Sequence, residues 1–331
     1  MSLSDVLDSL PKFKNDEILK SFIKSYKIIN DIQYDNILCS ISGGSDSDVM
    51  LDIVYRVDES KKVKYVWFDT GVEYQATKNH LKYLENKYNI EIIRVRAYEP
   101  IPLSVHKRGE PFLSKFVSEM LERLQRYNFK WEDKPYEELI KEYPKCKLAV
   151  KWWTNNNGKD SHFNINRNKY LKEFLVENPP TFKISNKCCY YSKKKTVEKV
   201  LKEYDIMLDI VGIRKSEGGL RSVAYKNCYT TDTKVHQYRP LFWFNDETKQ
   251  VYERVFNIKH SECYTKMGLG RTGCVCCPFG KNLEYELSQS QMYEPKLYNA
   301  VTNIFKNSYA YTRQYREFIE NMKTKKYNKL F

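Results

Sequence analysis

The chain has 331 residues and a net charge of +14, from 56 basic and 42 acidic side chains. Its content of 41% hydrophobic and 15% aromatic residues is enough for a packed core, which excludes a disordered chain. No apolar run is long enough to cross a bilayer, and the first residues lack the apolar segment of a secretion signal, so we expect a cytoplasmic protein without a membrane partner.

The positive charge has two interpretations. It fits a polyanionic partner such as DNA or RNA. Most of the basic residues are lysines, however, and they occur beside abundant asparagine, isoleucine and tyrosine. An AT-rich genome produces this mixture without any selection for binding, so composition leaves nucleic-acid binding open.

Strands and helices are predicted to alternate over the first hundred residues. The apolar pattern indicates one or two amphipathic helices in residues 1–33, strands at 36–42, 63–68 and 90–95, and helices at 46–56 and 73–88. This β-α-β-α-β order predicts a parallel sheet covered by helices on both faces.

The rest of the chain is less regular. A lysine-rich stretch at about 104–180 is predicted to be largely helical, a strand returns at 206–213, and a helix is expected at 312–323. We therefore expect an N-terminal helical segment (1–33), an α/β domain with a helical insertion (34–262), and a Cys-rich metal-binding segment with C-terminal helices (263–331).

A glycine pair lies between the first strand and its helix, in a loop formed by Ser42, Gly43, Gly44, Ser45, Asp46 and Ser47. Two glycines let backbone N–H groups approach an anion closely, and the helix N-terminus behind them favours negative charge. Since ligands bind at the carboxyl ends of parallel strands, this loop predicts a phosphate site. Asp46 would repel a phosphate, so we expect it to cap the helix or to hold Mg²⁺. The alternative is a simple glycine turn with a helix cap.

The loop resembles the signature of the PP-loop ATP pyrophosphatases, and a second motif narrows the resemblance. An acidic segment follows the second strand and contains Asp69, Thr70, Gly71 and Glu73. It resembles the segment that phosphoadenosine phosphosulfate (PAPS) reductases carry at this point, where the carboxylates suit ribose hydroxyls or a metal. An acidic helix start is the alternative. The resemblance implies a three-layer, parallel-sheet nucleotide-binding fold of the PP-loop, HUP-like type.

Two further segments extend the resemblance. The first is the adjacent pair Cys188 and Cys189, and the second is the stretch from Val211 that contains Arg214 and Arg221. In the PAPS reductase family such segments supply cluster-binding cysteines and an arginine-rich anion site. Arginine suits bidentate recognition of phosphate or sulfate. Ordinary surface charge is the alternative for both arginines.

A C-x-x-C motif, Cys274 and Cys277, adds two thiolates to that cysteine pair. The combined set resembles the adenylylsulfate reductases, in which a Cys pair and a later C-x-x-C hold a [4Fe–4S] cluster. Cys263 is a candidate to replace one of the adjacent pair. A tetrahedral zinc site uses the same ligands and remains an alternative.

The resemblance weakens at the level of the reaction. Sulfonucleotide reductases attack the sulfate sulfur with a cysteine in a C-terminal Glu-Cys-Gly-x-His segment, whereas no cysteine follows Cys277 here. The chain is more similar to phage- and mobile-element-type members and to the DNA-phosphorothioation member of the family.

This resemblance implies an enzyme that binds ATP or a related adenine nucleotide and adenylates an acceptor with release of pyrophosphate, in preparation for sulfur transfer. Asp46, Arg214 and Arg221 are the implied catalytic residues. Nucleic acid is a candidate acceptor, and a sulfur donor or thiol reductant protein is a candidate partner. Two alternatives remain: a sulfonucleotide reductase that uses an external thiol, and a metal-stapled nucleic-acid-binding or regulatory protein.

Overall fold

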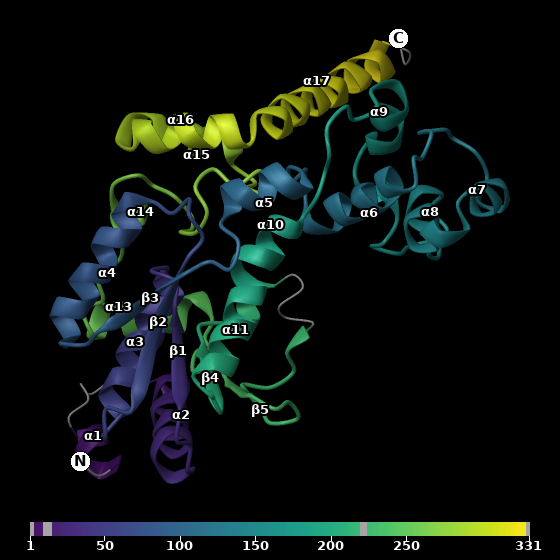
Figure 1. Ribbon diagram of the computed structural model, residues 1–331. Helices are drawn as coiled ribbons and strands as arrows, with labels where there is room; N and C mark the ends of the chain where they lie inside the picture. The colour runs from purple at the N-terminus through teal and green to yellow at the C-terminus, as the bar shows by residue number, and fades with distance from the viewer. Residues whose placement is uncertain (1–2, 9–14, 219–223, 329–331) are drawn as a thin grey trace. The chain divides into compact units, whose positions relative to one another are not determined.

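The computed structural model describes residues 3–8, 15–218 and 224–328, and the chain divides into two compact units. Unit 1 consists of Met1–Tyr98 and Lys193–Val275, and unit 2 of Glu99–Ser192 and Cys276–Phe331. Each unit has its own cluster of buried hydrophobic residues, as a compact domain requires. Figure 1 shows the helices and strands along the chain.

Unit 1 is built on a six-stranded sheet with the order β3-β2-β1-β4-β6-β5. Its strands are β1 (Ile37–Ile41), β2 (Val63–Asp69), β3 (Ile92–Arg96), β4 (Leu208–Val211), β5 (Tyr229–Thr230) and β6 (His236–Tyr238). Neighbouring strands run parallel, except that β5 pairs with β6 in the antiparallel direction. The predicted α/β class with a parallel sheet is therefore confirmed.

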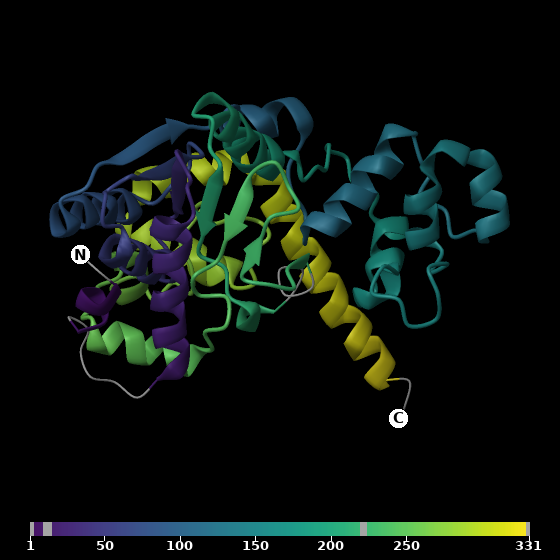
Figure 2. The same cartoon turned by 90° about the horizontal axis from the view of Figure 1, so that it is seen from below.

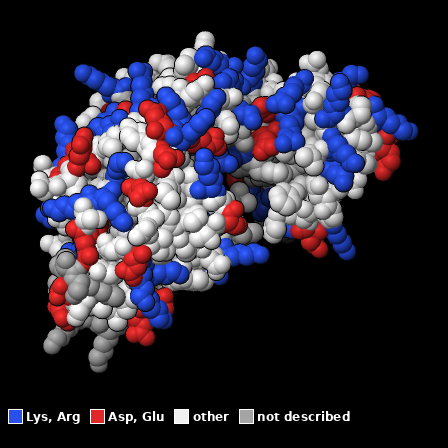
Figure 3. Space-filling model, turned by 60° about the horizontal axis from the view of Figure 1, so that its bottom comes forward, with Lys and Arg blue, Asp and Glu red and all other residues white. Residues whose placement is uncertain are grey.

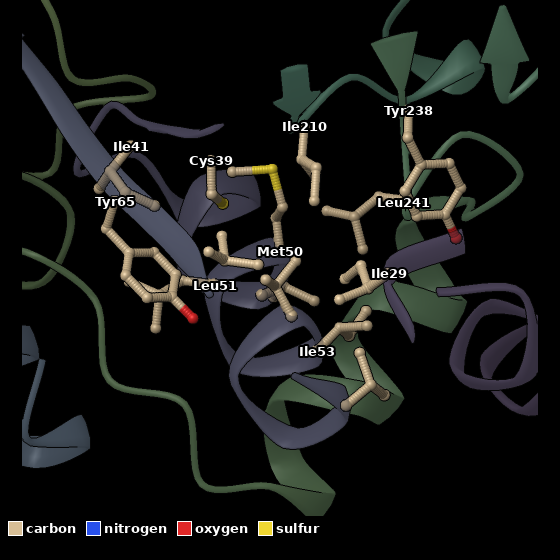
Figure 4. Packing of buried hydrophobic residues seen from close by; sticks show 14 of the residues in the cluster. Ile29, Cys39, Ile41, Met50, Leu51, Ile53, Tyr65, Ile210, Tyr238 and Leu241 are labelled. Carbon is tan, nitrogen blue, oxygen red and sulfur yellow. The ribbon is translucent and has the colours of Figure 1, made fainter. Parts of the chain in front are cut away.

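Helices cover both faces of this sheet. The helices of unit 1 are α1 (Leu3–Asp8), α2 (Asp16–Tyr26), η1 (Lys27–Asp31), α3 (Ser45–Val57), α4 (Gln75–Tyr88), α11 (Lys195–Glu203), η5 (Lys215–Glu217), α13 (Asp246–Val255) and α14 (Glu262–Thr265). Cys39 and Ile41 of β1 pack with Met50 of α3 on one face (Figure 4). Leu38, the residue before Cys39 in β1, belongs to a different buried cluster and packs with Val200 of α11. Because side chains alternate along a strand, one buried strand joins two hydrophobic layers, and the predicted three-layer arrangement is confirmed.

Unit 2 is helical in the residues that the structure describes, as expected for the stretch 104–180. Its helices are α5 (Ile101–Arg108), α6 (Lys115–Arg126), α7 (Tyr136–Glu142), η2 (Pro144–Cys146), α8 (Lys147–Trp153), η3 (Ile165–Arg167), α9 (Leu171–Glu177), α10 (Lys187–Cys189), η4 (Tyr190–Lys194, whose last residues enter unit 1), α15 (Leu283–Tyr293), α16 (Pro295–Ile304) and α17 (Lys306–Asn328). Its core is aromatic, with Trp152, Trp153 and Phe174 fully buried.

Helix α17, drawn in yellow in Figure 2, belongs to this core through its aromatic side chains. Tyr311 and Tyr315 pack against Phe174, with ring centroids 4.9 and 5.1 Å away. The buried carboxylate of Glu110 accepts the backbone N–H of Ser308 at 2.7 Å and so caps the first turn of α17. Across the described ranges, no helix combines the length and the apolar character that a bilayer crossing requires.

Candidate nucleotide-binding site

The candidate site lies in unit 1, at the point where the order of the strands reverses. From β1 the chain continues to β2 and β3 on one side, whereas β4, on the other side of β1, leads to β6. Ligands of open parallel sheets bind in the crevice outside the carboxyl ends of the strands at such a point. Here β1 leads into the loop Ser42–Ser47, and β4 leads into Gly212 and Arg214. A side chain at Gly212 would come within 3.3 Å of the carbonyl oxygen of Asp46, so the two loops lie close together.

The two glycines of the phosphate loop have different structural roles. Gly43 has φ +68°, and a Cβ there would lie 2.8 Å from Cγ2 of Thr77, so only glycine fits without strain. Gly44 has φ −91°, which any residue can adopt, but its Cβ would lie 3.1 Å from Oγ1 of Thr272 and 3.2 Å from Oγ of Ser42. Gly43 therefore shapes the turn, and Gly44 lets the hydroxyl groups of Thr272 and Ser42 approach the backbone closely.

Hydroxyl groups accept the backbone N–H donors of this loop. The N–H of Ser42 donates to Oγ of Ser47 at 2.9 Å, and the N–H of Gly44 donates to Oγ of Ser42 at 3.2 Å. The N–H of Ser45, the first residue of α3, donates to the phenol oxygen of Tyr264 at 3.2 Å. The donors therefore face oxygen acceptors at a helix N-terminus, which is the kind of partner that a phosphate provides.

The carboxylate of Asp46 pairs with two cations. Its Oδ2 lies 2.9 Å from Nε of Arg214, and its Oδ1 lies 2.8 Å from Nζ of Lys249 on α13. Burial disfavours the charged carboxylate, but hydrogen bonds with Glu217, Lys249 and Arg214 outweigh burial and hold the pKa of Asp46 below its ordinary value. Asp46 thus keeps an arginine and a lysine beside the loop. The other predicted arginine, Arg221, lies outside the described residues.

Behind the loop, Asp48 begins a chain of ionisable groups. Its side chain is buried, with Oδ1 3.0 Å from Nε2 of His80 and Oδ2 2.8 Å from Nδ1 of His260. The other ring nitrogen of His260 lies 2.9 Å from Oε1 of Glu253, and the same oxygen lies 3.3 Å from Nζ of Lys249. These contacts link the first turn of α3 to α4 and α13, so they fix the helix end that carries the loop.

The network predicts a pH-dependent stability. Burial opposes the charge of His260, but its contacts with Asp48 and Glu253 prevail and raise the pKa of His260 from 6.5 to about 9. A histidine whose pKa is raised on folding stabilises the fold fully below pH 6.5, and this stabilisation is lost as the pH rises through about 9. We expect the free energy of unfolding to fall over this window by at most about 3 kcal/mol, measured by urea denaturation. The variant His260→Gln should lack this fall, and a wild-type slope in that variant would contradict the assignment.

The acidic segment after β2 forms a tight turn. Gly71 has φ +91°, and its N–H donates to Oδ1 of Asp69 at 2.9 Å. The hydroxyl of Thr70 donates to Oε1 of Glu73 at 2.5 Å, and burial raises the pKa of Glu73. Glu73 is 6% exposed, whereas Asp69 is half-buried. Of the two predicted carboxylates, Asp69 is therefore the more accessible to a ligand.

Within unit 1, the part of the Cys-rich segment around Cys274 packs against the Asp69–Glu73 turn. The N–H of Val275 donates to the carbonyl oxygen of Val72 at 2.9 Å, and Cys274 forms an isolated β-bridge with Glu73. Sγ of Cys274 lies 3.7 Å from Oγ1 of Thr70. Upstream, Cys263 is buried, with Sγ 3.6 Å from Oγ1 of Thr77. Two of the predicted metal ligands thus contact threonines in the segment that follows β2: Thr70 in the turn and Thr77 in α4.

The other three predicted ligands, Cys188, Cys189 and Cys277, belong to unit 2. Among residues 3–8, 15–218 and 224–328, no three His, Cys, Asp or Glu side chains gather as a metal site. The predicted set consists of thiols only, which is the donor chemistry of iron–sulfur clusters and of structural zinc. The metal site is therefore still a prediction.

Sequence reasoning missed several residues of the site, which come from distant parts of the chain: Asp48, His80, Lys249, Glu253, His260, Tyr264 and Thr272. Asp48 could have been found, since a second acid in the first turn of α3 is unusual beside a phosphate loop. The others carry no local signal, because they follow the first strand by many residues and only the fold brings them to the loop.

A comparison with models of protein families identifies the family that this part of the chain matches. Residues 36–147 match the family model described as the phosphoadenosine phosphosulfate reductase domain. Residues 36–147 thus match a PAPS reductase domain. The matched range contains the phosphate loop and the Asp69–Glu73 turn, which confirms the predicted family. That domain family is one of enzymes, so the match supports the prediction of an enzyme.

A curated relative and several solved structures are similar to the chain. The uncharacterized protein MJ0066 of Methanocaldococcus jannaschii is 24% identical over 274 residues, which are 82% of this chain and 41% of that protein. This chain thus spans less than half the length of that relative. The crystal structure of the PAPS reductase of Candida auris in complex with phosphate is similar to the chain, with a TM-score of 0.43 and 11% sequence identity. The similarity covers 80% of this chain and 98% of that one.

A further likeness is to the U34-tRNA thiolase NcsA of Methanococcus maripaludis with its [4Fe-4S] cluster, with a TM-score of 0.39 at 13% identity. It covers 93% of this chain and 82% of that one. The FMN adenylyltransferase of Candida glabrata in complex with ATP is also similar, with a TM-score of 0.42 and 12% sequence identity. The similarity covers 82% of this chain and 67% of that one. Likenesses at this level do not establish a shared ligand or reaction.

Proposed function

We propose that the PAPS reductase domain of this chain binds ATP, or a related adenine nucleotide, with its phosphates on the loop Ser42–Ser47. The observation that supports this proposal most is the loop itself. Its turn requires Gly43, hydroxyl groups approach the backbone closely at Gly44, and N–H donors lie at the start of α3. Its position at the strand-order reversal is where this fold class binds ligands. Asp69, the more accessible carboxylate of the acidic turn, is suited to the ribose hydroxyls.

The reaction that we propose is adenylyl transfer. An oxygen of the acceptor attacks the α-phosphorus, the bond from this phosphorus to the bridging oxygen breaks, and pyrophosphate leaves with the electron pair. Arg214 lies at Asp46, where its guanidinium can stabilise the charge that develops on the phosphates. Mg²⁺ accompanies the triphosphate, and Arg221 acts with Arg214. The adenylated acceptor is then activated for displacement by sulfur.

Nucleic acid is the acceptor that we propose. The net charge of +14 favours a polyanionic substrate. On the face shown in Figure 3, basic and acidic side chains are interspersed, so recognition would rest on individual phosphate contacts along the surface rather than on one strongly basic field.

A second candidate is reduction of PAPS or adenylylsulfate by an external thiol, which the family match favours. In that reaction the thiol sulfur attacks the sulfate sulfur, the nucleotide leaves, and a second thiol releases sulfite.

Two assays separate the candidates. Pyrophosphate release from ATP, measured with and without DNA or RNA, should rise when the acceptor is added. Sulfite formation from PAPS with thioredoxin supplied should stay at background. Sulfite formation without pyrophosphate release would replace the first candidate with the second.

We also propose that Cys188, Cys189, Cys274 and Cys277 hold a [4Fe–4S] cluster, with Cys263 as a substitute for one of the adjacent pair and zinc as the alternative metal. The support is the donor chemistry alone, since four thiolates without histidine favour iron–sulfur.

Replacing Cys277 with serine is expected to remove most of the iron and acid-labile sulfide from anaerobically purified protein. Cys276 supplies the matched control. It is fully buried, with Sγ 3.1 Å from Oγ of Ser290, so Cys276→Ala should cost about 1–2 kcal/mol of stability but leave the metal content unchanged. Wild-type protein with one zinc and no sulfide would support a structural metal site, and wild-type protein without any metal would contradict the proposal.

A further inference from the structure

Lys249 on α13 contacts the phosphate loop directly. Its Nζ lies 2.7 Å from Oγ of Ser45 and 2.8 Å from Oδ1 of Asp46, the first two residues of α3. Its side chain is 13% exposed. The N-terminus of a helix carries a partial positive charge, so an ammonium at this end is unfavourable unless an anion accompanies it. The carboxylates of Asp46 and Glu253 supply such anions here, so they hold the ammonium at the helix end that carries the phosphate loop.

The ammonium of Lys249 is held by its neighbours. Glu253, one turn further along α13, has Oε1 3.3 Å from Nζ, and this oxygen lies 2.9 Å from Nε2 of His260. His260 is in turn held by the buried Asp48. Lysine rotamers are numerous, and these contacts restrict them, so the charge is positioned before any ligand arrives.

The three partners of the ammonium differ in strength. An ammonium has three N–H donors, and here they face the Asp46 carboxylate, the Glu253 carboxylate and the Ser45 hydroxyl. Hydrogen bonds between charged groups are stronger than those with a neutral partner. The hydroxyl of Ser45 is thus the partner that an incoming phosphate oxygen displaces most easily.

We infer that Lys249 is a phosphate-binding residue of this loop, with the β- and γ-phosphates of a nucleoside triphosphate as its ligand. The inference rests on the proposed function and adds a residue from a distant part of the chain. A phosphate oxygen replaces Oγ of Ser45 on Nζ, while Asp46 and Glu253 keep the ammonium in place. Because the contact is to the outer phosphates, Lys249 distinguishes ATP from AMP.

The test compares the dissociation constants of ATP and AMP for the wild-type chain and for Lys249→Ala, Lys249→Met and Lys249→Arg. We expect the first two variants to bind ATP about 10- to 100-fold more weakly, with AMP affinity changed by less than about 3-fold, since a charged hydrogen bond is lost. Lys249→Arg should retain most of the ATP affinity. Arg254→Ala is the matched control, because Arg254 is an exposed cation on the same helix.

Thermal melting of each variant establishes that it is folded, and Lys249→Met, which keeps most of the side-chain volume, serves if Lys249→Ala does not fold. Wild-type ATP affinity in a folded Lys249→Ala or Lys249→Met chain would overturn the inference while leaving the proposed function intact. An equal loss of ATP and AMP affinity would also overturn it. A wild-type chain that binds neither nucleotide would overturn both.

Discussion

Replacing Gly44 with valine is expected to weaken ATP binding by at least about 100-fold in a chain that still folds. The backbone at Gly44 has φ −91°, which valine can adopt, so the substitution introduces no backbone strain. Its Cβ would approach Oγ1 of Thr272 and Oγ of Ser42, and the methyl groups would occupy the space in front of the N–H donors. Equilibrium dialysis with labelled ATP measures the binding, and thermal melting reports the fold.

Gly43 provides the contrasting control. It has φ +68° and a Cβ position 2.8 Å from Thr77, so Gly43→Ala should lower the melting temperature as well as the affinity. If Gly44→Val is folded and binds ATP like the wild type, this loop does not bind the nucleotide.

The second large effect is expected on stability. Asp48→Ala should lower the free energy of unfolding by about 3–5 kcal/mol, because it removes the buried partner of two histidines. The charged form of His260 would be left with Glu253 alone. Urea denaturation at neutral pH measures the loss.

Asp48→Asn keeps the shape and one oxygen acceptor, so its cost should be smaller. Glu262→Ala removes a carboxylate that is 65% exposed, and its effect should stay below about 0.5 kcal/mol. A loss below about 1 kcal/mol in Asp48→Ala would mean that the network does not hold the start of α3.

The elements around the loop could be predicted from the sequence because their signals are local. The strand expected at 36–42 is β1 (Ile37–Ile41), and the helix expected at 46–56 is α3 (Ser45–Val57). An apolar run followed by two glycines and a helical apolar period determines both. By contrast, β5 and β6 were not predicted, because they contain two and three residues and have no apolar alternation.

The side chains that surround the loop could not be predicted in this way. Lys249, His260 and Tyr264 reach the start of α3 only because α13 and α14 pack near it, and the sequence separation hides this contact. The partners of Asp46 were hidden for the same reason. Its neighbours in sequence predict a helix cap or a Mg²⁺ ligand, and they give no sign that it pairs with Arg214 and Lys249 in the fold.

A calorimetric titration of the folded chain with Mg²⁺–ATP tests the central claim most directly, when it is repeated in the presence of inorganic pyrophosphate. We predict binding of one ATP per chain, with an affinity that pyrophosphate lowers by competing for the loop Ser42–Ser47. No heat of binding, or ATP binding that pyrophosphate leaves unchanged, would contradict a phosphate site at this loop.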